Sequence, residues 1–549
     1  MIDKSKVYKG SVCDLTFDGK GIVKIDSYPV FVENAVLGDE IIFEVTKTNK
    51  TYGFGKIKEI SLPSPDRCVP KCKDFESCGG CDLSHIRYEK QLEIKKERVL
   101  SCLVRLGKLE KDSFEIYDTL GMDEPSEYRN KMVFPIGVNK MKKVVGGFYR
   151  RASHEIVELK SCSQGPEIAS RYLGAVLEYM RKNNISAYDE KTHKGLIRRV
   201  FVRLGKTTKE AMVVISANGN NLPEAEKLID ALLSLHDNSY SLKSVILNIN
   251  KQKNNLVLGE KNVTLYGEGF IFDTLCGVKF KISPNSFFQV NPYQTEKLYQ
   301  KAIEFAELSG KETVIDLYCG IGTISLLAAK SAGKVIGVEI VDQAIKDAIE
   351  NAKENKISNA EFITGSAETI SVELSDSGIK ADVIFIDPPR KGSDEVTLDC
   401  ICKMSPEKIV YISCNPATLA RDLAYLEMKG YKTIKVQPVD MFPNTNHVET
   451  VVLLSQLKPD DVIEVDIDHD ELDITSFESK ATYEEIKAYV LNNYGFKVSS
   501  LYIAQIKTKY GIKDDVNYNI SKKCLRVPAY PPEKEKAITE ALRHFKMID

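Results

Sequence analysis

The sequence predicts an α/β protein whose largest part is a doubly wound parallel sheet, with a small β-barrel before it and a helical extension after it. The sheet is predicted because strand-like runs alternate with helical stretches after about residue 275, as in a sheet covered by helices on both faces. The barrel is predicted because short β-type runs separated by glycine turns fill the first sixty residues. The runs expected to form the sheet are Glu312–Leu317, Lys334–Glu339, Ala360–Gly365, Ala381–Asp387 and Lys408–Ser413.

A chain of 549 residues has room for three or four domains of ordinary size. We expect an OB-like barrel over residues 1–60, an α+β central domain over 61–270, a Rossmann-like domain over 271–457, and an acidic linker with a helical extension over 458–549. A small barrel of this kind often binds oligonucleotides, although it can also serve only to pack on its neighbour. The expected barrel strands are Lys9–Leu15, Gly21–Ile25, Val30–Val32, Glu40–Thr46 and Phe54–Ile60.

The central domain and the C-terminal tail show weaker patterns. Residues 82–106 read as a strongly basic helix, and the central domain should contain the strands Val200–Leu204, Ala211–Ser216 and Ser244–Asn250. In the tail, Thr482 to Glu485 form a capping-box pattern that opens a helix, and a second helix is expected over Leu501–Tyr510. This pair is compatible with a helix–turn–helix that adds RNA contacts and equally with a plain helical appendage.

Composition indicates a cytoplasmic protein. The apolar fraction of 43% is enough for several cores, while no run of 18 or more apolar residues suggests a membrane span. The N-terminus lacks the apolar core of a signal peptide, so the 13 cysteines are expected to be thiols or metal ligands rather than disulfides. The formal net charge of −2 does not indicate a nucleic-acid partner, but the acidic stretch at 460–471 can mask a basic face elsewhere.

A ligand site is predicted where the first strand of the sheet ends. The run Asp316 to Thr323 contains two glycines that let the backbone approach a ligand, and a helix follows. Glu339, 19 residues beyond Gly320, ends the next strand, where its carboxylate can accept both ribose hydroxyls. A dinucleotide or S-adenosylmethionine could use this arrangement. Ser325 occupies the third glycine position of a dinucleotide fingerprint, which favours S-adenosylmethionine over NAD.

A thiol and two carboxylates are predicted to complete a covalent active site. Cys414 follows a strand and precedes a helix start, Asp387 begins the run Asp-Pro-Pro-Arg, and Glu449 precedes a buried strand. Enzymes that methylate exocyclic amines usually have an aromatic residue where Arg390 stands, so different chemistry is expected. Addition of a thiolate to carbon 6 of a pyrimidine activates carbon 5 for methylation, and a general base then removes the carbon 5 proton. Cys414 and Glu449 are the candidates for these roles, with His447 as a neighbour.

A second group of cysteines has the spacing of a metal centre. Cys72, Cys78 and Cys81 form a C-x5-C-x2-C array with glycines between the last two, which favours an iron–sulfur cluster over zinc. A fourth ligand has to come from elsewhere, and the sequence offers Cys68, Cys102 and Cys162.

Several of these motifs together resemble the RNA uracil-5-methyltransferase family. They are the runs 413–422, 387–390, 316–320 and 446–449, and the resemblance covers about residues 1–456. It implies a nucleophile at Cys414, a base at Glu449, and S-adenosylmethionine binding by the residues Gln289, Tyr318, Glu339 and Asp387. It also implies a [4Fe–4S] cluster on Cys72, Cys78, Cys81 and Cys162, and likens the barrel to the RNA-binding TRAM domain.

The resemblance points to methylation of a uridine in 23S ribosomal RNA by a monomer without membrane attachment. The barrel and the cysteine array favour ribosomal RNA over the T-loop uridine of tRNA, because the tRNA enzymes of this family often lack both. A protein that only binds or assembles RNA is a further alternative. RNA contacts are expected at residues 128–131 and 147–151, where cations and aromatic residues alternate, unless these are solvated surface charges.

Overall fold

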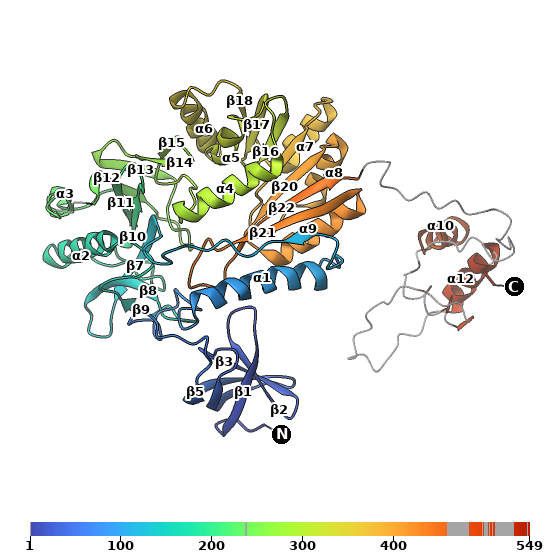
Figure 1. The fold of residues 1–549 in the computed structure, drawn as a ribbon, viewed down its shortest axis with the longest axis horizontal. Coiled ribbons are helices and arrows are strands. Elements are labelled where there is room, and N and C mark those ends of the chain that lie inside the picture. The colour runs from blue at the N-terminus through green and yellow to red at the C-terminus, as the bar shows by residue number, and fades with distance from the viewer. Residues whose placement is uncertain are drawn as a thin grey trace. The chain divides into compact units, whose positions relative to one another are not determined.

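The computed structural model describes residues 2–235 and 239–457, and parts of the C-terminal region: 483–496, 498, 503, 506–507, 509–510, 532–545 and 547–548. The chain forms two compact units, Met1–Pro459 and Asp460–Asp549 (Figure 1). The first unit contains the barrel, a seven-stranded sheet, a hairpin and an eight-stranded sheet. No helix among these described residues is long and apolar enough to cross a membrane.

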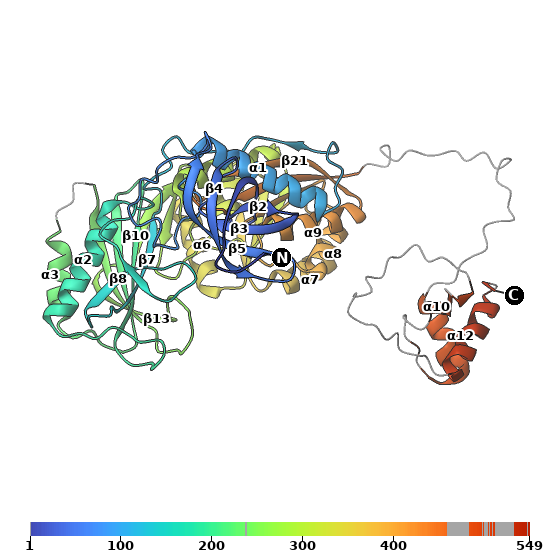
Figure 2. The same cartoon turned by 90° about the horizontal axis from the view of Figure 1, so that it is seen from below.

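The N-terminal barrel is closed and contains the five expected strands. Its strands follow one another around the barrel in the order β1-β2-β3-β5-β4, and Figure 2 shows the blue barrel strands next to the N-terminus. Every second side chain points inward, so that Val30, Val32, Phe43 and Val45 fill the core. The strands are β1 (Val7–Leu15), β2 (Gly21–Ile25), β3 (Tyr28–Glu33), β4 (Glu40–Thr48) and β5 (Gly53–Leu62).

The central sheet has the order β13-β12-β11-β10-β7-β8-β9 and is covered by two helices. Helix α2 (Glu167–Lys182) and helix α3 (Ala225–Leu233) bury their apolar faces against it. The strands are β7 (Lys131–Val138), β8 (Val144–Tyr149), β9 (Ile156–Glu158), β10 (Ile197–Leu204), β11 (Glu210–Ala217), β12 (Ser241–Ile249) and β13 (Lys261–Gly267). A hairpin of β14 (Ile271–Leu275) and β15 (Val278–Ile282) follows.

The large sheet has the order β18-β17-β16-β19-β20-β22-β21-β6. Its strands are parallel except for β22, which runs antiparallel between β20 and β21. The order reverses between β16 and β19, and in open α/β sheets a ligand crevice lies at the carboxyl end of the strands at such a point. The strands are β6 (Glu115–Ile116), β16 (Thr313–Leu317), β17 (Lys334–Glu339), β18 (Ala360–Thr364), β19 (Val383–Ile386), β20 (Lys408–Ser413), β21 (Tyr431–Val439) and β22 (Glu449–Gln456).

Helices cover both faces of this sheet, as the alternation of strands and helices predicts (Figure 1). Consecutive strand residues therefore enter different cores: Phe385 packs in one, and Ile384 and Ile386 pack in the other. One face is covered by α4 (Pro292–Ala306), α5 (Thr323–Ala328) and α6 (Asp342–Glu354), and the other by α1 (Tyr88–Arg105), α7 (Ala367–Asp376), α8 (Glu395–Met404) and α9 (Pro416–Met428).

Two segments that were expected in the central domain lie on or in this sheet: one is a helix that packs on it, and the other is a strand at its edge. Helix α1 starts at Tyr88, six residues later than the basic run suggested, and buries Val99 and Leu103 in the core shared with α9. Strand β6 pairs with β21 at the edge of the sheet. The expected domain boundaries at 60, 270 and 457 stay predictions.

The C-terminal unit has its own small core. Helices α10 (Tyr483–Tyr494) and α12 (Pro532–His544) pack together through Ile486, Val490, Ile538 and Leu542. Helix α10 begins directly after the expected capping residue, but Thr482 itself lies outside the described residues. So do the acidic stretch at 460–471 and half of the residues of the helix expected at 501–510.

Candidate active site

The turn after β16 leaves room for a ligand at the switch point of the sheet. Tyr318, Gly320 and Gly322 adopt left-handed φ values of 72°, 57° and 84°. A side chain on Gly322 would lie 3.1 Å from Phe362 and is therefore disfavoured by space as well as by φ. A side chain on Gly320 would meet nothing within 4 Å, so its backbone faces open space.

The serine at the third glycine position has a structural partner. The Ser325 hydroxyl donates a hydrogen bond to Asp316 over 2.5 Å, and both side chains are fully buried. Burial raises the pKa of Asp316 to about 7, while the bond from Ser325 opposes the rise. Sequence reasoning used Ser325 only to argue against NAD. The structure shows that it binds the carboxylate below the ligand turn.

Glu339 stands at the end of β17 beside this turn. One carboxylate oxygen accepts a hydrogen bond from the amide of Gly320 over 3.1 Å, and the other accepts one from Val341 over 2.9 Å. The carboxylate is therefore tied to the glycine turn from which a ligand would be held.

One cavity of about 630 Å³ brings together all six predicted site residues of the sheet domain; we call it the switch-point cavity. Its predicted residues are Gln289, Tyr318, Glu339, Asp387, Cys414 and Glu449. They come from segments that are far apart in sequence but meet at one edge of the sheet. The geometry permits the roles predicted for them, which stay predictions.

The strand register explains why Cys414 and Glu449 meet. Ser413 at the end of β20 pairs with Thr450 of antiparallel β22, so the next residue outward on each strand is Cys414 or Glu449. The Asn415 side chain caps α9 by accepting a hydrogen bond from Ala417, and Pro416 is the first helical residue. Cys414 is thus fixed between a strand end and a helix start.

Burial makes the thiol and both carboxyl groups hard to ionise. It raises the pKa of Cys414 to about 11, with Glu449 and Asp387 adding to the rise and Arg390 opposing it. Burial also raises the pKa of Glu449 to about 8, again with a contribution from Asp387, and that of Asp387 to about 7. The free protein therefore holds a protonated thiol beside acids that titrate near neutral pH.

Sequence reasoning did not place Tyr299 and Phe442, which line this cavity, and it expected His447 only as a neighbour of the catalytic candidates. Tyr299 of α4 is fully buried there, and Phe442 and His447 form part of the wall. Burial lowers the pKa of His447 to about 4, so its ring is neutral at physiological pH. Tyr299 and Phe442 carry no recognisable motif, and only the fold brings them to the site.

The cysteine array lines a second cavity, of about 280 Å³, which we call the cysteine cavity. Cys72, Cys78, Cys81 and Cys162 all contribute to its wall, together with the cations Arg129 and Lys131. Burial raises the pKa of Cys81 to about 12, with Cys162 as the next cause. Among the residues that the structure describes, no group of three or more acidic, histidine or cysteine side chains is placed to hold a single metal ion.

The other two cysteines considered as a fourth ligand lie elsewhere. The Cys68 thiol points to the carbonyl oxygen of Ser84 at 3.5 Å, and Cys102 is buried in the core between α1 and the sheet. Neither Cys68 nor Cys102 is among the described residues that line the cysteine cavity.

The RNA contact expected at residues 128–131 is wrong for Tyr128 and Asn130. Tyr128 is 1% exposed and donates a hydrogen bond to the carbonyl oxygen of Pro443 over 3.2 Å. Asn130 is 6% exposed and binds the carbonyl oxygen of Gln289 over 3.0 Å. These polar side chains satisfy backbone groups inside the unit and are not available to RNA.

Comparisons with known proteins give a consistent result. Residues 87–457 match the family model described as tRNA (uracil-5-)-methyltransferase. A protein of Clostridium tetani named only as an uncharacterized RNA methyltransferase is 46% identical over 454 residues, covering 83% of this chain and 97% of its own. A Listeria innocua protein of the same description is 46% identical over 456 residues, covering 83% and 99%.

Among solved structures, the chain is similar to the Pyrococcus abyssi tRNA (uracil-54, C5)-methyltransferase in complex with S-adenosyl-L-homocysteine. The TM-score is 0.64 and the sequences are 28% identical, with 81% of this chain and 100% of that chain covered.

Proposed function

The chain belongs to the tRNA (uracil-5-)-methyltransferase family and is an S-adenosylmethionine-dependent RNA uracil-5-methyltransferase; from this premise we propose that it methylates carbon 5 of a uridine in 23S ribosomal RNA through a covalent adduct with Cys414. The observation that carries the mechanism is the switch-point cavity, in which Cys414 and Glu449 stand next to the glycine turn and Glu339. A nucleophile, a base and a donor site share one cavity, as this chemistry requires.

In the proposed reaction the Cys414 thiolate adds to carbon 6 of the uracil, and the electron pair moves to form an enolate. Carbon 5 attacks the sulfonium methyl group, and S-adenosylhomocysteine leaves as a neutral thioether. Glu449 then takes the carbon 5 proton, the carbon 6–sulfur bond breaks, and the carbon 5–carbon 6 double bond and the Cys414 thiolate are restored. Gln289, Tyr318, Glu339 and Asp387 are proposed to hold the donor.

The mechanism is tested by incubating the Cys414→Ala protein with substrate RNA and labelled donor. We expect no methyl transfer, with S-adenosylhomocysteine binding retained because the donor residues are intact. Undiminished transfer by this variant would exclude Cys414 as the nucleophile.

We further propose that Cys72, Cys78, Cys81 and Cys162 hold a [4Fe–4S] cluster in the cysteine cavity. The donor set fits, because four thiols surround one cavity and thiolates are the usual ligands of such clusters. The charge fits too, since Arg129 and Lys131 line the same wall and a thiolate-bound cluster is anionic. Its role is structural, because the proposed chemistry at Cys414 needs no redox centre.

The ligand set is tested by measuring iron in Cys162→Ala, with Cys68→Ala as the matched control. Cys162→Ala should lose most of its iron and the visible absorption of a cluster, whereas Cys68→Ala should keep both. Full iron content in Cys162→Ala would refute the assignment.

The RNA class has two candidates. The resemblance links a barrel together with a cysteine array to the ribosomal RNA enzymes, and the barrel is proposed to be an RNA-binding TRAM domain. The T-loop uridine of tRNA is favoured by one observation: the solved structure that aligns over 81% of this chain belongs to an enzyme named for uracil 54 of tRNA.

Mapping 5-methyluridine in ribosomal RNA and tRNA from cells lacking the protein decides between them. Loss of a modified uridine in 23S RNA, restored by the wild-type protein but not by Cys414→Ala, supports our proposal. Loss confined to tRNA would replace it with the second candidate.

A further inference from the structure

Residues 440–448 form the loop that joins β21 to β22 and ends directly at Glu449. This 440–448 loop also carries Phe442 and His447, which line the switch-point cavity and pack edge to face at 5.9 Å. Building on the proposed function, we propose that Lys95 of α1 is a positioning residue for the base: its buried ion pair with Asp440 fixes this loop and thereby the place of Glu449.

The ion pair is fully enclosed. The Lys95 side chain is 1% exposed and that of Asp440 0%. The Lys95 ammonium contacts one carboxylate oxygen of Asp440 and donates a second hydrogen bond to the carbonyl oxygen of Phe442 over 3.1 Å. The other carboxylate oxygen accepts a bond from the Tyr88 hydroxyl over 2.8 Å. Two side chains of α1 therefore fix the start of the loop at three points.

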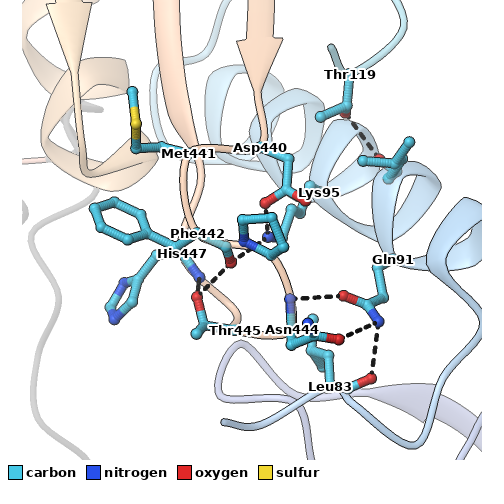
Figure 3. Close-up of polar contacts among 12 residues, drawn as sticks. Leu83, Gln91, Lys95, Thr119, Asp440, Met441, Phe442, Asn444, Thr445 and His447 are labelled. Atoms are coloured by element: carbon cyan, nitrogen blue, oxygen red, sulfur yellow. Dashed lines mark hydrogen bonds and ion pairs between the residues drawn. The ribbon is translucent and has the colours of Figure 1, made fainter. Parts of the chain in front are cut away.

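The middle of the loop is held by the same helix and by the segment before it. The Gln91 amide oxygen accepts a bond from the Asn444 amide over 3.0 Å, and the Gln91 nitrogen binds the carbonyl oxygen of Leu83 over 3.1 Å. The backbone amides of Asp82 and Leu83 both donate to the Asn444 carbonyl oxygen over 3.0 Å. Figure 3 shows Lys95 and Gln91 reaching from α1 into the loop from one side.

The end of the loop is fixed in turn by its own hydrogen bonds. The Thr445 hydroxyl donates to the Phe442 carbonyl oxygen over 2.8 Å, and the His447 amide donates to the Thr445 hydroxyl oxygen over 3.3 Å. The carbonyl oxygen that Lys95 holds is thus linked through Thr445 to His447, two residues before Glu449.

A purely stabilising role does not account well for this pair. Burying two charges gives little net stability compared with an apolar pair of similar shape, whereas it demands one particular geometry. Lys95 is not among the described residues that line the switch-point cavity, so it acts on the reaction only through the loop. Displacing the loop should leave Cys414 on β20 in place while moving Glu449.

This separation predicts a specific defect. Addition of Cys414 and methyl transfer precede removal of the carbon 5 proton, so a misplaced base should let the methylated adduct form and then persist. We would incubate Lys95→Met with unmodified transcripts of 23S rRNA and tRNA plus labelled donor, and measure the denaturant-stable protein–RNA adduct. We expect at least a tenfold larger adduct fraction than in the wild type, and a matching fall in tritium release from 5-tritiated uridine.

Three further variants make the result decisive. Glu449→Gln is the positive control for adduct accumulation. Arg67→Met breaks a partly buried pair, Arg67–Asp39, whose residues do not line the switch-point cavity, and it should not accumulate adduct. The double variant Lys95→Met/Asp440→Leu leaves no unpaired buried charge, so it should fold even if the single variant does not, and it should still accumulate adduct.

The outcomes separate the inference from the function on which it rests. Adduct in Glu449→Gln but wild-type turnover in the double variant would show that the pair serves only stability, and would refute the inference. The inference would also be refuted if the Lys95 variants formed no adduct and lost methyl transfer and proton release only in proportion to the fraction of unfolded protein. Absence of adduct in Glu449→Gln would overturn the proposed base itself and the inference with it.

Discussion

Replacing Glu449 by glutamine should make the Cys414 thiol more reactive toward iodoacetamide, although the same change removes the proposed base. The reactive species is the thiolate, and the pKa of Cys414 is about 11 instead of its ordinary 9.0. Burial is the main cause and remains in the variant. Glu449 is the second cause, and its negative charge disfavours a thiolate beside it.

The size of the effect can be bounded. At pH 9 a thiol with its ordinary pKa of 9.0 is half ionised, whereas one with a pKa of about 11 is ionised in roughly one molecule in a hundred. Complete relief would therefore accelerate alkylation about fiftyfold. Because burial remains, we expect a several-fold gain for Glu449→Gln. The Glu449 pKa of about 8 means that its charge is mostly present at this pH.

The assay is peptide mass spectrometry of Cys414 after timed alkylation, with exposed Cys13 as the internal reference. Arg390→Gln is the matched control of opposite sign, because Arg390 lowers the pKa of Cys414 and its loss should slow alkylation. A site that is merely loosened would react faster in both variants. An unchanged or slower rate in Glu449→Gln would refute the electrostatic reasoning.

Three more outcomes are expected. The rate of carbon 5 proton release from the preformed adduct should rise about tenfold between pH 6 and 7 and level off above pH 9, because Glu449 has to lose its proton, with a pKa of about 8, before it can act as a base. Tritium release from adduct that is formed first and then transferred to each pH measures this step apart from ionisation of Cys414, and a flat profile would contradict the role. Gly322→Ala should weaken donor binding and lower the free energy of unfolding by about 1–3 kcal/mol, because φ is 84° and the added carbon meets Phe362. Calorimetry measures the donor binding, and unchanged values would show that the turn adapts. Ser325→Ala should lower the free energy of unfolding by about 1–3 kcal/mol, and by more at pH 8 than at pH 6. Removing the hydroxyl raises the pKa of Asp316 beyond about 7, so that ionisation of this buried carboxyl group opposes folding more strongly at the higher pH. Urea titrations at both pH values test the sign.

The strands of the large sheet and of the barrel could be predicted from sequence because each strand rests on a local pattern, whereas their order in the sheet came only from the structure. Strand β17 has the expected limits, Lys334–Glu339, and β2 has the expected limits, Gly21–Ile25. Buried parallel strands are continuous apolar runs, and glycine turns separate the barrel strands, so each signal lies within a few residues. The site residues at strand ends followed from the same signals.

What could not be predicted depends on contacts between distant segments. Tyr128 and Asn130 lie in a run of cations and aromatic residues that reads as surface, yet they bind the backbone at Pro443 and Gln289. The partnership of Lys95 with Asp440 spans most of the chain, and neither residue stands in a motif. Side chains of this kind are assigned by tertiary packing, which no local pattern encodes.

Strand β6 has a consequence for how the protein is made. Glu115 pairs with Lys435 at the edge of the large sheet, about 320 residues later, and α1 rests on the same sheet. At a synthesis rate of roughly 5–20 residues per second, these N-terminal pieces emerge from the ribosome about 15 to 60 seconds before their partner strand exists. The apolar side of α1, with Val99 and Leu103, has to remain uncovered during that interval. A fragment starting at residue 271 would have the opposite defect, an open edge on β21, and should aggregate when expressed alone.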